Sequence, residues 1–174
     1  NLKQEVFHEY GVTIKRLRSI GISAMMHGYL VLDEKEEQLV PFRTWRNTMT
    51  EEAADILTEM FHFNIPQRWS IAHLYQAILN KEEHVSKIKF FTTLAGYVHY
   101  HLTGRNVLGI GDASGMFPID SKTRDYNEEM LMTFQALVEP YQYPWLRNYN
   151  YNHCNKQIFF SKAHFQSIPY FPLY

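Results

Sequence analysis

The chain has 174 residues, of which 45% are hydrophobic and 20% are charged, and its formal net charge is -1. This balance is typical of one globular domain and excludes a disordered chain. The sequence has no Lys/Arg cluster, which argues against a nucleic acid partner, and no apolar run approaches the roughly 18 residues of a membrane span.

The cysteine content bears on the cellular compartment of the protein, and the composition of the two ends bears on the bounds of its domain. Cys154 is the single cysteine, so we expect no internal disulfide and a cytoplasmic protein. Its neighbour His153 leaves a catalytic thiol as a formal alternative. The N-terminus does not have the pattern of a signal peptide. Residues 147–174 lack Asp, Glu and Gly, and we expect a domain over residues 1–146 followed by an atypical tail from truncation or a frame shift.

Short extended segments are expected in the first part of the chain, after a helix-like pattern that starts at Leu2. Apolar runs bounded by small or polar residues predict strands over residues 18–24 and 29–32. The turn between them contains Met26 and His27. A third extended piece is expected over residues 39–45, where Pro41 favours an edge or a strand start.

Helices dominate the rest of the chain, because apolar residues recur there at helical spacing. Thr48 and Glu51 have the spacing of a capping box at the first helix, with Thr50 as a competing cap. The predicted helices run from this cap to about Phe61, over 71–79, over 92–102 with a stop at Gly104, and from the cap Asn127 to about Val138. Strands followed by helices predict an α/β layer arrangement.

The segment between Gly109 and Gly115 places one carboxylate, Asp112, in a glycine-flanked turn. Glycine lets the backbone bend sharply and approach a ligand closely. A carboxylate in such a turn can accept the proton of a bound hydroxyl group if it stays ionised. The alternative is that Asp112 caps a turn or a helix, since Asp favours both positions.

Three other side chains are candidates for ligand contacts. His27 follows a predicted strand, where loops gather around ligands in α/β proteins, and the alternative is an ordinary loop histidine. Trp45 could stack on a sugar ring or belong to the core. Arg68 could contact substrate or lie on the surface. No His-Glu-x-x-His or similar pattern occurs, so we expect no protein-bound transition metal.

Four of these segments together resemble the FGGY family of carbohydrate kinases over roughly residues 1–146. Residues 21–28 are similar to the family's Gly-Ile-Ser-x-x-Met-His-Gly segment, and residues 44–48 stand at its Trp-x-Asp-x-Arg segment. Residues 93–104 match the stretch that ends in Leu-Thr-Gly, and residues 112–116 match the Asp-Ala-Ser-Gly block. The four segments occur in the family's order.

The resemblance implies a fold and a set of roles. The fold would be the actin-like ATPase, ribonuclease-H-like N-terminal domain of the family, in incomplete form. Asp112 would be the catalytic base that activates a hydroxyl group of a pentulose-like sugar for attack on ATP with Mg²⁺. The resemblance also implies a set of substrate-binding residues: Met26, His27, Trp45, Arg68 and Ala113.

Two departures and two missing parts limit what the resemblance implies. The acid and the base of the tryptophan segment are replaced by Asn47 and Met49, so the identity of the sugar does not transfer. Residues 67–70 are also unlike the commonest family sequences, although Arg68 falls where some pentulose kinases carry a sugar-contacting arginine. The family's phosphate loop is expected before Asn1, and its ATP-binding domain is expected after this chain. ATP and Mg²⁺ would therefore bind mostly outside it.

Two other interpretations remain open. A sugar-binding module without catalysis would also lack the phosphate loop, although such a module needs no base. An inactive gene fragment is the third possibility. The expected partner is a small-molecule sugar, with no nucleic acid and no membrane, and the expected parent protein is a homodimer.

Overall fold

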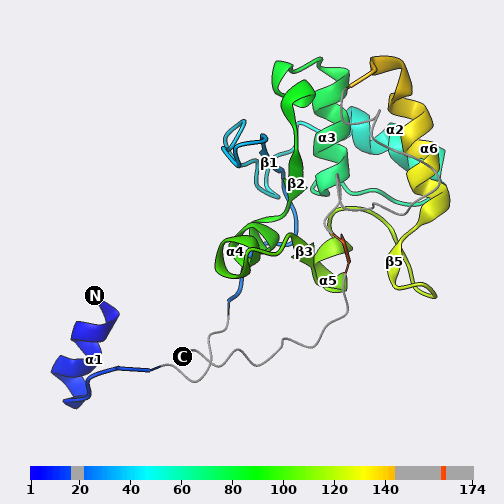
Figure 1. The fold of residues 1–174 in the computed structure, drawn as a ribbon. Coiled ribbons are helices and arrows are strands. Elements are labelled where there is room, and N and C mark those ends of the chain that lie inside the picture. Colours follow the sequence, from blue (N-terminus) through cyan, green and yellow to red (C-terminus); the bar gives the residue numbers. More distant parts are fainter. Residues whose placement is uncertain (17–21, 144–161, 164–174) are drawn as a thin grey trace. The chain divides into compact units, whose positions relative to one another are not determined.

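The computed structural model describes residues 1–16 and 22–143, together with the backbone of residues 162–163 (Figure 1). The described residues fall into two compact units: residues 1–16 with 22–23 belong to one, and residues 24–143 with 162–163 belong to the other. The tail predicted over residues 147–174 lies outside the described residues except for that short backbone segment.

The described helix of the first unit is α1 (Leu2–Tyr10), as its sequence pattern predicts. The side chain of Asn1 accepts a hydrogen bond from the Lys3 N–H, and the helix ends at Gly11 in the left-handed conformation with φ 66°. None of its residues is buried. In the part of the chain that the structure describes, no helix is long and apolar enough to cross a bilayer.

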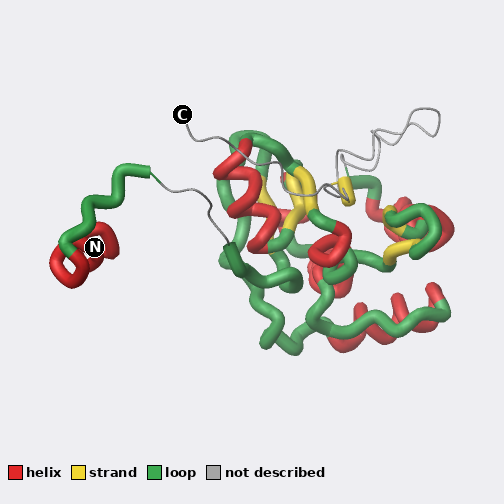
Figure 2. The backbone as a smooth tube through the Cα atoms, turned by 90° about the horizontal axis from the view of Figure 1, so that it is seen from below, coloured by secondary structure: helices red, strands yellow, loops and turns green. Residues whose placement is uncertain are grey.

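The second unit contains the remaining described elements (Figures 1 and 2). Its helices are α2 (Glu51–Phe61), α3 (Ser70–Leu79), α4 (Leu94–Thr103), the one-turn helix α5 (Ile110–Ala113) and α6 (Glu128–Val138). The 3₁₀ turns are η1 (Glu83–Lys87) and η2 (Glu139–Tyr141). The strands are β1 (Leu30–Leu32), β2 (Phe90–Thr92), β3 (Val107–Leu108), β4 (Ile119–Asp120), β5 (Asp125–Tyr126) and β6 (Lys162–Ala163).

The strands form three short pairs. β1 pairs antiparallel with β2, with Val31 opposite Phe91, β3 pairs parallel with β6, and β4 pairs antiparallel with β5. On the other side of β1, Tyr29 bridges to Arg43 and Leu32 bridges to Gln38. β1 therefore has a neighbour on both sides, which agrees with its complete burial.

The centre of the core is α3, in which every residue from Ser70 to Ile78 is buried. Figure 1 shows this helix between the β1–β2 pair and the helices α2 and α6. One cluster of buried residues joins these elements through Val31, Leu57 and Leu74. A helix that is buried on every side, with mostly apolar residues, is expected only where neighbours cover all of its faces.

His73 is a polar side chain at the centre of this core. It lies on α3, is fully buried, and both of its ring nitrogens are without a hydrogen-bond partner. Its ring lies 6.3 Å from the ring of Tyr29. Burial lowers the pKa of His73 to about 4, since a charged imidazole would have to leave water. His73 is therefore a neutral ring that packs as part of the core.

Several sequence predictions differ from the structure. The strand predicted over 18–24 is irregular in its described part, where Ile22 is 53% exposed and cannot occupy a core strand. The rest of that prediction lies outside the described residues. The extended piece over 39–45 is no strand: it bridges at Arg43 to Tyr29, the residue before β1, and the Leu39 N–H donates to the Val31 carbonyl over 3.0 Å. Thr48 does not cap α2, because the cap position belongs to Thr50, whose hydroxyl group donates to the Gln67 carbonyl instead.

Candidate functional site

Asp112 lies inside α5 and not in an open turn. Its Oδ2 accepts a hydrogen bond of 2.6 Å from the hydroxyl group of Thr93, which belongs to a different element. Its Oδ1 is closed to solvent and has no hydrogen-bond partner. The carboxylate therefore does not cap a local turn or helix, and it keeps unused capacity to accept a hydrogen bond.

The environment of Asp112 changes its acidity. Burial raises the pKa of Asp112, and the hydrogen bond from Thr93 lowers it in part. A carboxyl group with a raised pKa is a stronger base once it is ionised. Raised pKa values of this kind are common at functional sites and less common elsewhere.

Thr93 connects this carboxylate to α4. Its Oγ1 accepts a hydrogen bond of 3.0 Å from the Gly96 N–H and so caps α4, while its own proton points to Asp112. Thr93 lies in the segment that ends in Leu-Thr-Gly, and the sequence indicated no role for it. Its place before the helix could have identified it as the cap of α4, but its contact with Asp112 depends on the fold.

His27 lies on the loop before β1, and its ring makes two polar contacts. Its Nδ1 is 3.4 Å from the Gly115 carbonyl oxygen, and its Nε2 is 3.4 Å from Nε of Arg68. A carbonyl only accepts and a guanidinium only donates, so the proton belongs on Nδ1 and the lone pair on Nε2. Burial lowers the pKa of His27, and the positive charge of Arg68 adds to this effect. The imidazole is a neutral group that bridges two elements.

Backbone contacts bring the His27 loop against α4 and α5. The Ala95 N–H donates to the Met25 carbonyl over 3.3 Å, at the start of α4. A Cβ on Gly115 would lie 2.5 Å from the Met26 carbonyl oxygen and 2.6 Å from Nδ1 of His27. Glycine at position 115 is what permits this close approach. Asp112, Thr93, Met26, His27 and Arg68 consequently belong to one neighbourhood.

Ala113 and Trp45 lie differently from the other predicted residues. Ala113 is fully buried, and its backbone N–H and carbonyl bond within α5 and the following turn, so its contact with a substrate stays a prediction. Trp45 is 48% exposed, which contradicts a core position, and the guanidinium of Arg46 lies 5.2 Å from its ring centroid.

A shallow cavity of about 540 Å³ lies along residues 40–44, 46 and 47. A second, much smaller cavity is lined by residues 32, 90, 92, 97, 100 and 106, so neither of these two is lined by Asp112 or His27.

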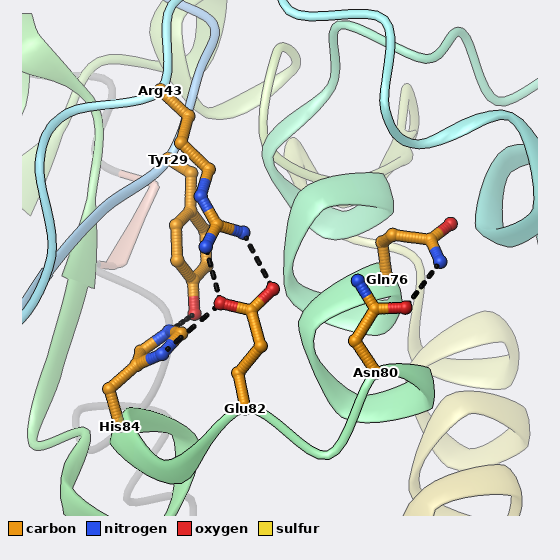
Figure 3. A network of polar contacts seen from close by, with 6 residues as sticks. All are labelled: Tyr29, Arg43, Gln76, Asn80, Glu82 and His84. Carbon is orange, nitrogen blue, oxygen red and sulfur yellow. Dashed lines mark hydrogen bonds and ion pairs between the residues drawn. The ribbon is translucent and has the colours of Figure 1, made fainter.

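A polar network anchors the segment that leads to Trp45 (Figure 3). Arg43 binds both carboxylate oxygens of Glu82, with one contact of 3.1 Å, and its guanidinium lies 5.2 Å from the ring centroid of Tyr29. The Nδ1 atom of His84 is 3.5 Å from Oε2 of Glu82, and its Nε2 atom is 2.8 Å from the hydroxyl oxygen of Tyr29. Burial alone would raise the pKa of Glu82, but the bonds and charge of Arg43 lower it overall. No sequence signal indicated this network, since its members are far apart in the chain.

Comparison with solved structures identifies the class of fold. The chain superposes on the gluconate kinase of Lactobacillus acidophilus with a TM-score of 0.63 and 19% identity, over 75% of this chain and 27% of that one. A ligand-bound xylulose kinase of the same organism gives a TM-score of 0.61 and 18% identity, over 75% of this chain and 29% of that one. The fold is α/β, of the actin-like ATPase class that these sugar kinases share.

Sequence comparison identifies the family. Residues 2–160 match the model of the FGGY family of carbohydrate kinases, N-terminal domain, and the chain belongs to this family. The xylulose kinase of Staphylococcus xylosus is 24% identical over 124 residues, which are 66% of this chain and 26% of that protein. A xylulose kinase of Haemophilus influenzae is 26% identical over 124 residues. The chain spans about a quarter of the length of these relatives.

Proposed function

We propose that the protein containing this chain transfers a phosphoryl group from ATP to a hydroxyl group of a pentulose-like sugar in the cytoplasm. The observation that carries the proposal is the Asp112 carboxylate, which has one unpartnered oxygen and lies in the same neighbourhood as His27. Membership of a carbohydrate kinase family supports the reaction class. Two relatives named as xylulose kinases support the sugar class.

In the proposed reaction Asp112 is the general base. Its ionised carboxylate takes the proton of the sugar hydroxyl group, and the sugar oxygen attacks the γ-phosphorus of ATP in line. The bond between that phosphorus and the bridging oxygen breaks, and ADP leaves. Phosphoryl transfer leaves most of catalysis to positioning and charge stabilisation, and a base of this kind contributes about 10²–10⁴-fold. Because Oδ1 is closed to solvent in this structure, the proposal requires the site to open slightly around that oxygen when the sugar binds.

His27 and Arg68 are the proposed sugar contacts beside Asp112. The neutral His27 ring offers a lone pair at Nε2, which Arg68 occupies in this structure. A sugar hydroxyl group could replace this long contact by donating to Nε2 and accepting from the guanidinium. Met26 would line the same space. Trp45 is a proposed stacking surface on the neighbouring segment, since about half of its surface is exposed.

ATP would supply the phosphoryl group, and Mg²⁺ would neutralise its charge. The described part of the chain has no group of three acidic, His or Cys side chains that could hold a metal ion. We propose that the ligands for Mg²⁺ and most contacts to ATP belong to other segments of the protein.

The proposal is tested by measuring ADP release with the protein as its gene encodes it. The assay would compare pentuloses, hexuloses, polyols and sugar acids. We expect sugar-dependent ADP release, greatest with a pentulose. Sugar binding without ADP release would favour the binding-module alternative. Neither binding nor release with any of these compounds would overturn the proposal.

A further inference from the structure

Thr93 is the hydrogen-bond partner of the Asp112 carboxylate in the described part of the chain. The distance between its Oγ1 and Asp112 Oδ2 is 2.6 Å, which is typical of a hydroxyl group that donates to an ionised carboxylate. Thr93 is itself fully buried. Its side chain therefore cannot turn to solvent for an alternative partner.

The direction of this hydrogen bond is fixed by α4. The Gly96 N–H points at Thr93 Oγ1 over 3.0 Å, so the hydroxyl oxygen acts as an acceptor there. The single hydroxyl proton remains for Asp112. A donor aimed in this way favours the ionised form of Asp112, which can accept it at either oxygen, over the protonated form. The positive end of the α4 helix dipole acts in the same direction.

The other groups around Asp112 do not replace Thr93. Burial raises the pKa of Tyr126 on β5, and the charges of Asp112 and Asp125 add to this effect, so its phenol is neutral and brings no charge to the carboxylate. His27 contacts Gly115 and not the carboxylate. Burial raises the pKa of Asp112, and Thr93 is the group that opposes this change.

We propose that Thr93 is a positioning residue, which holds Asp112 in its ionised form and orients it for proton transfer. This inference rests on the proposed function, in which Asp112 is the base. A base that is partly buried and has no such donor would be protonated, and hence inactive, over a wider range of pH. Thr93 thereby links the capping of α4 to the ionisation state of the Asp112 carboxylate.

The test compares three variants of the protein as its gene encodes it. Thr93→Val keeps the shape of the side chain and removes the hydroxyl group, while Thr93→Ser keeps the hydroxyl group. Asn127→Ala removes the matching cap of α6, where Asn127 Oδ1 accepts from the Met130 N–H over 3.0 Å, and it leaves Asp112 untouched. The measurement is the dependence of kcat/KM on pH.

We expect the acid limb of the profile to move to higher pH in Thr93→Val, so that the activity lost at mildly acidic pH exceeds the loss at alkaline pH several-fold. Thr93→Ser should restore the wild-type limb, and Asn127→Ala should not move it. An unmoved limb in Thr93→Val, or an equal movement in Asn127→Ala, would overturn the inference.

A second measurement does not depend on activity. Thr93→Val should lower the thermal midpoint more at neutral pH than at acidic pH, because the lost bond involves the ionised Asp112. In an Asp112→Asn background this pH dependence should disappear. An identical dependence in both backgrounds would overturn the inference, whereas failure of ADP release in the wild type would remove only the proposed function.

Discussion

Gly115 shows how one missing side chain shapes the site. A Cβ at position 115 would lie 2.6 Å from His27 Nδ1 and 2.5 Å from the Met26 carbonyl oxygen, so only glycine admits both groups. Its carbonyl oxygen also accepts from His27 Nδ1 and from the Ser70 N–H. At the neighbouring Gly111, by contrast, a Cβ would meet no other atom within 4 Å. The two glycines therefore differ sharply in their tolerance of substitution.

We predict that Gly115→Ala raises the KM for sugar and destabilises the fold by about 1–3 kcal/mol, since either the backbone or His27 must move. The control is Gly111→Ala, which should leave KM unchanged and stability within about 1 kcal/mol of the wild type. Steady-state kinetics and urea unfolding check both. Equal behaviour of the two variants would mean that the close approach at position 115 has no influence on the site.

At the scale of elements, the Arg43–Glu82 pair joins the segment before Trp45 to the turn after α3. The two side chains are 15% and 22% exposed, so the pair is largely shielded from water. A bidentate Arg–carboxylate pair in such a place has more geometric order than a surface ion pair. Because Arg43 lies on the segment that bridges to Tyr29, the pair helps to hold the Trp45 segment in register with β1.

We predict that Glu82→Gln destabilises the protein by about 1–3 kcal/mol at neutral pH, because Arg43 loses its charged partner. The Arg43 charge lowers the pKa of Glu82 in the folded state, so the pair stabilises the fold above the ordinary carboxyl pKa and is lost as pH falls through the folded pKa. The effect of the substitution should therefore shrink toward acidic pH. Denaturant unfolding at several pH values measures it, and a pH-independent loss would assign the effect to packing.

At the scale of the whole molecule, local signals predicted the helices best. The apolar spacing and the caps Asn127 and Gly104 gave α2, α3, α4 and α6 at nearly their observed bounds, because these signals act within a few residues. Strand β2 was missed, since its three residues gain their structure only from pairing with β1. The strand predicted over 18–24 failed at Ile22, where an apolar run alone did not specify a partner.

The candidate site was predictable only in part, because several of its polar contacts join residues that are far apart in the chain. The resemblance to the family proposed Asp112, His27 and Arg68 as site residues, and the structure brings His27 and Arg68 into contact. The bond between Thr93 and Asp112 joins residues 19 positions apart, and the bond between Arg43 and Glu82 joins residues 39 apart. No local pattern encodes such pairs. They depend on how the helices pack around α3.

The measurement that tests the central claim most directly is the kcat of Asp112→Asn in the protein as its gene encodes it, together with the Kd for sugar. Asparagine keeps the shape and can still accept the Thr93 hydrogen bond, but it cannot take a proton. We predict that kcat falls by about 10²–10⁴-fold while the sugar Kd stays within about a few-fold of the wild type. An unchanged kcat would contradict the assignment of Asp112 as the base.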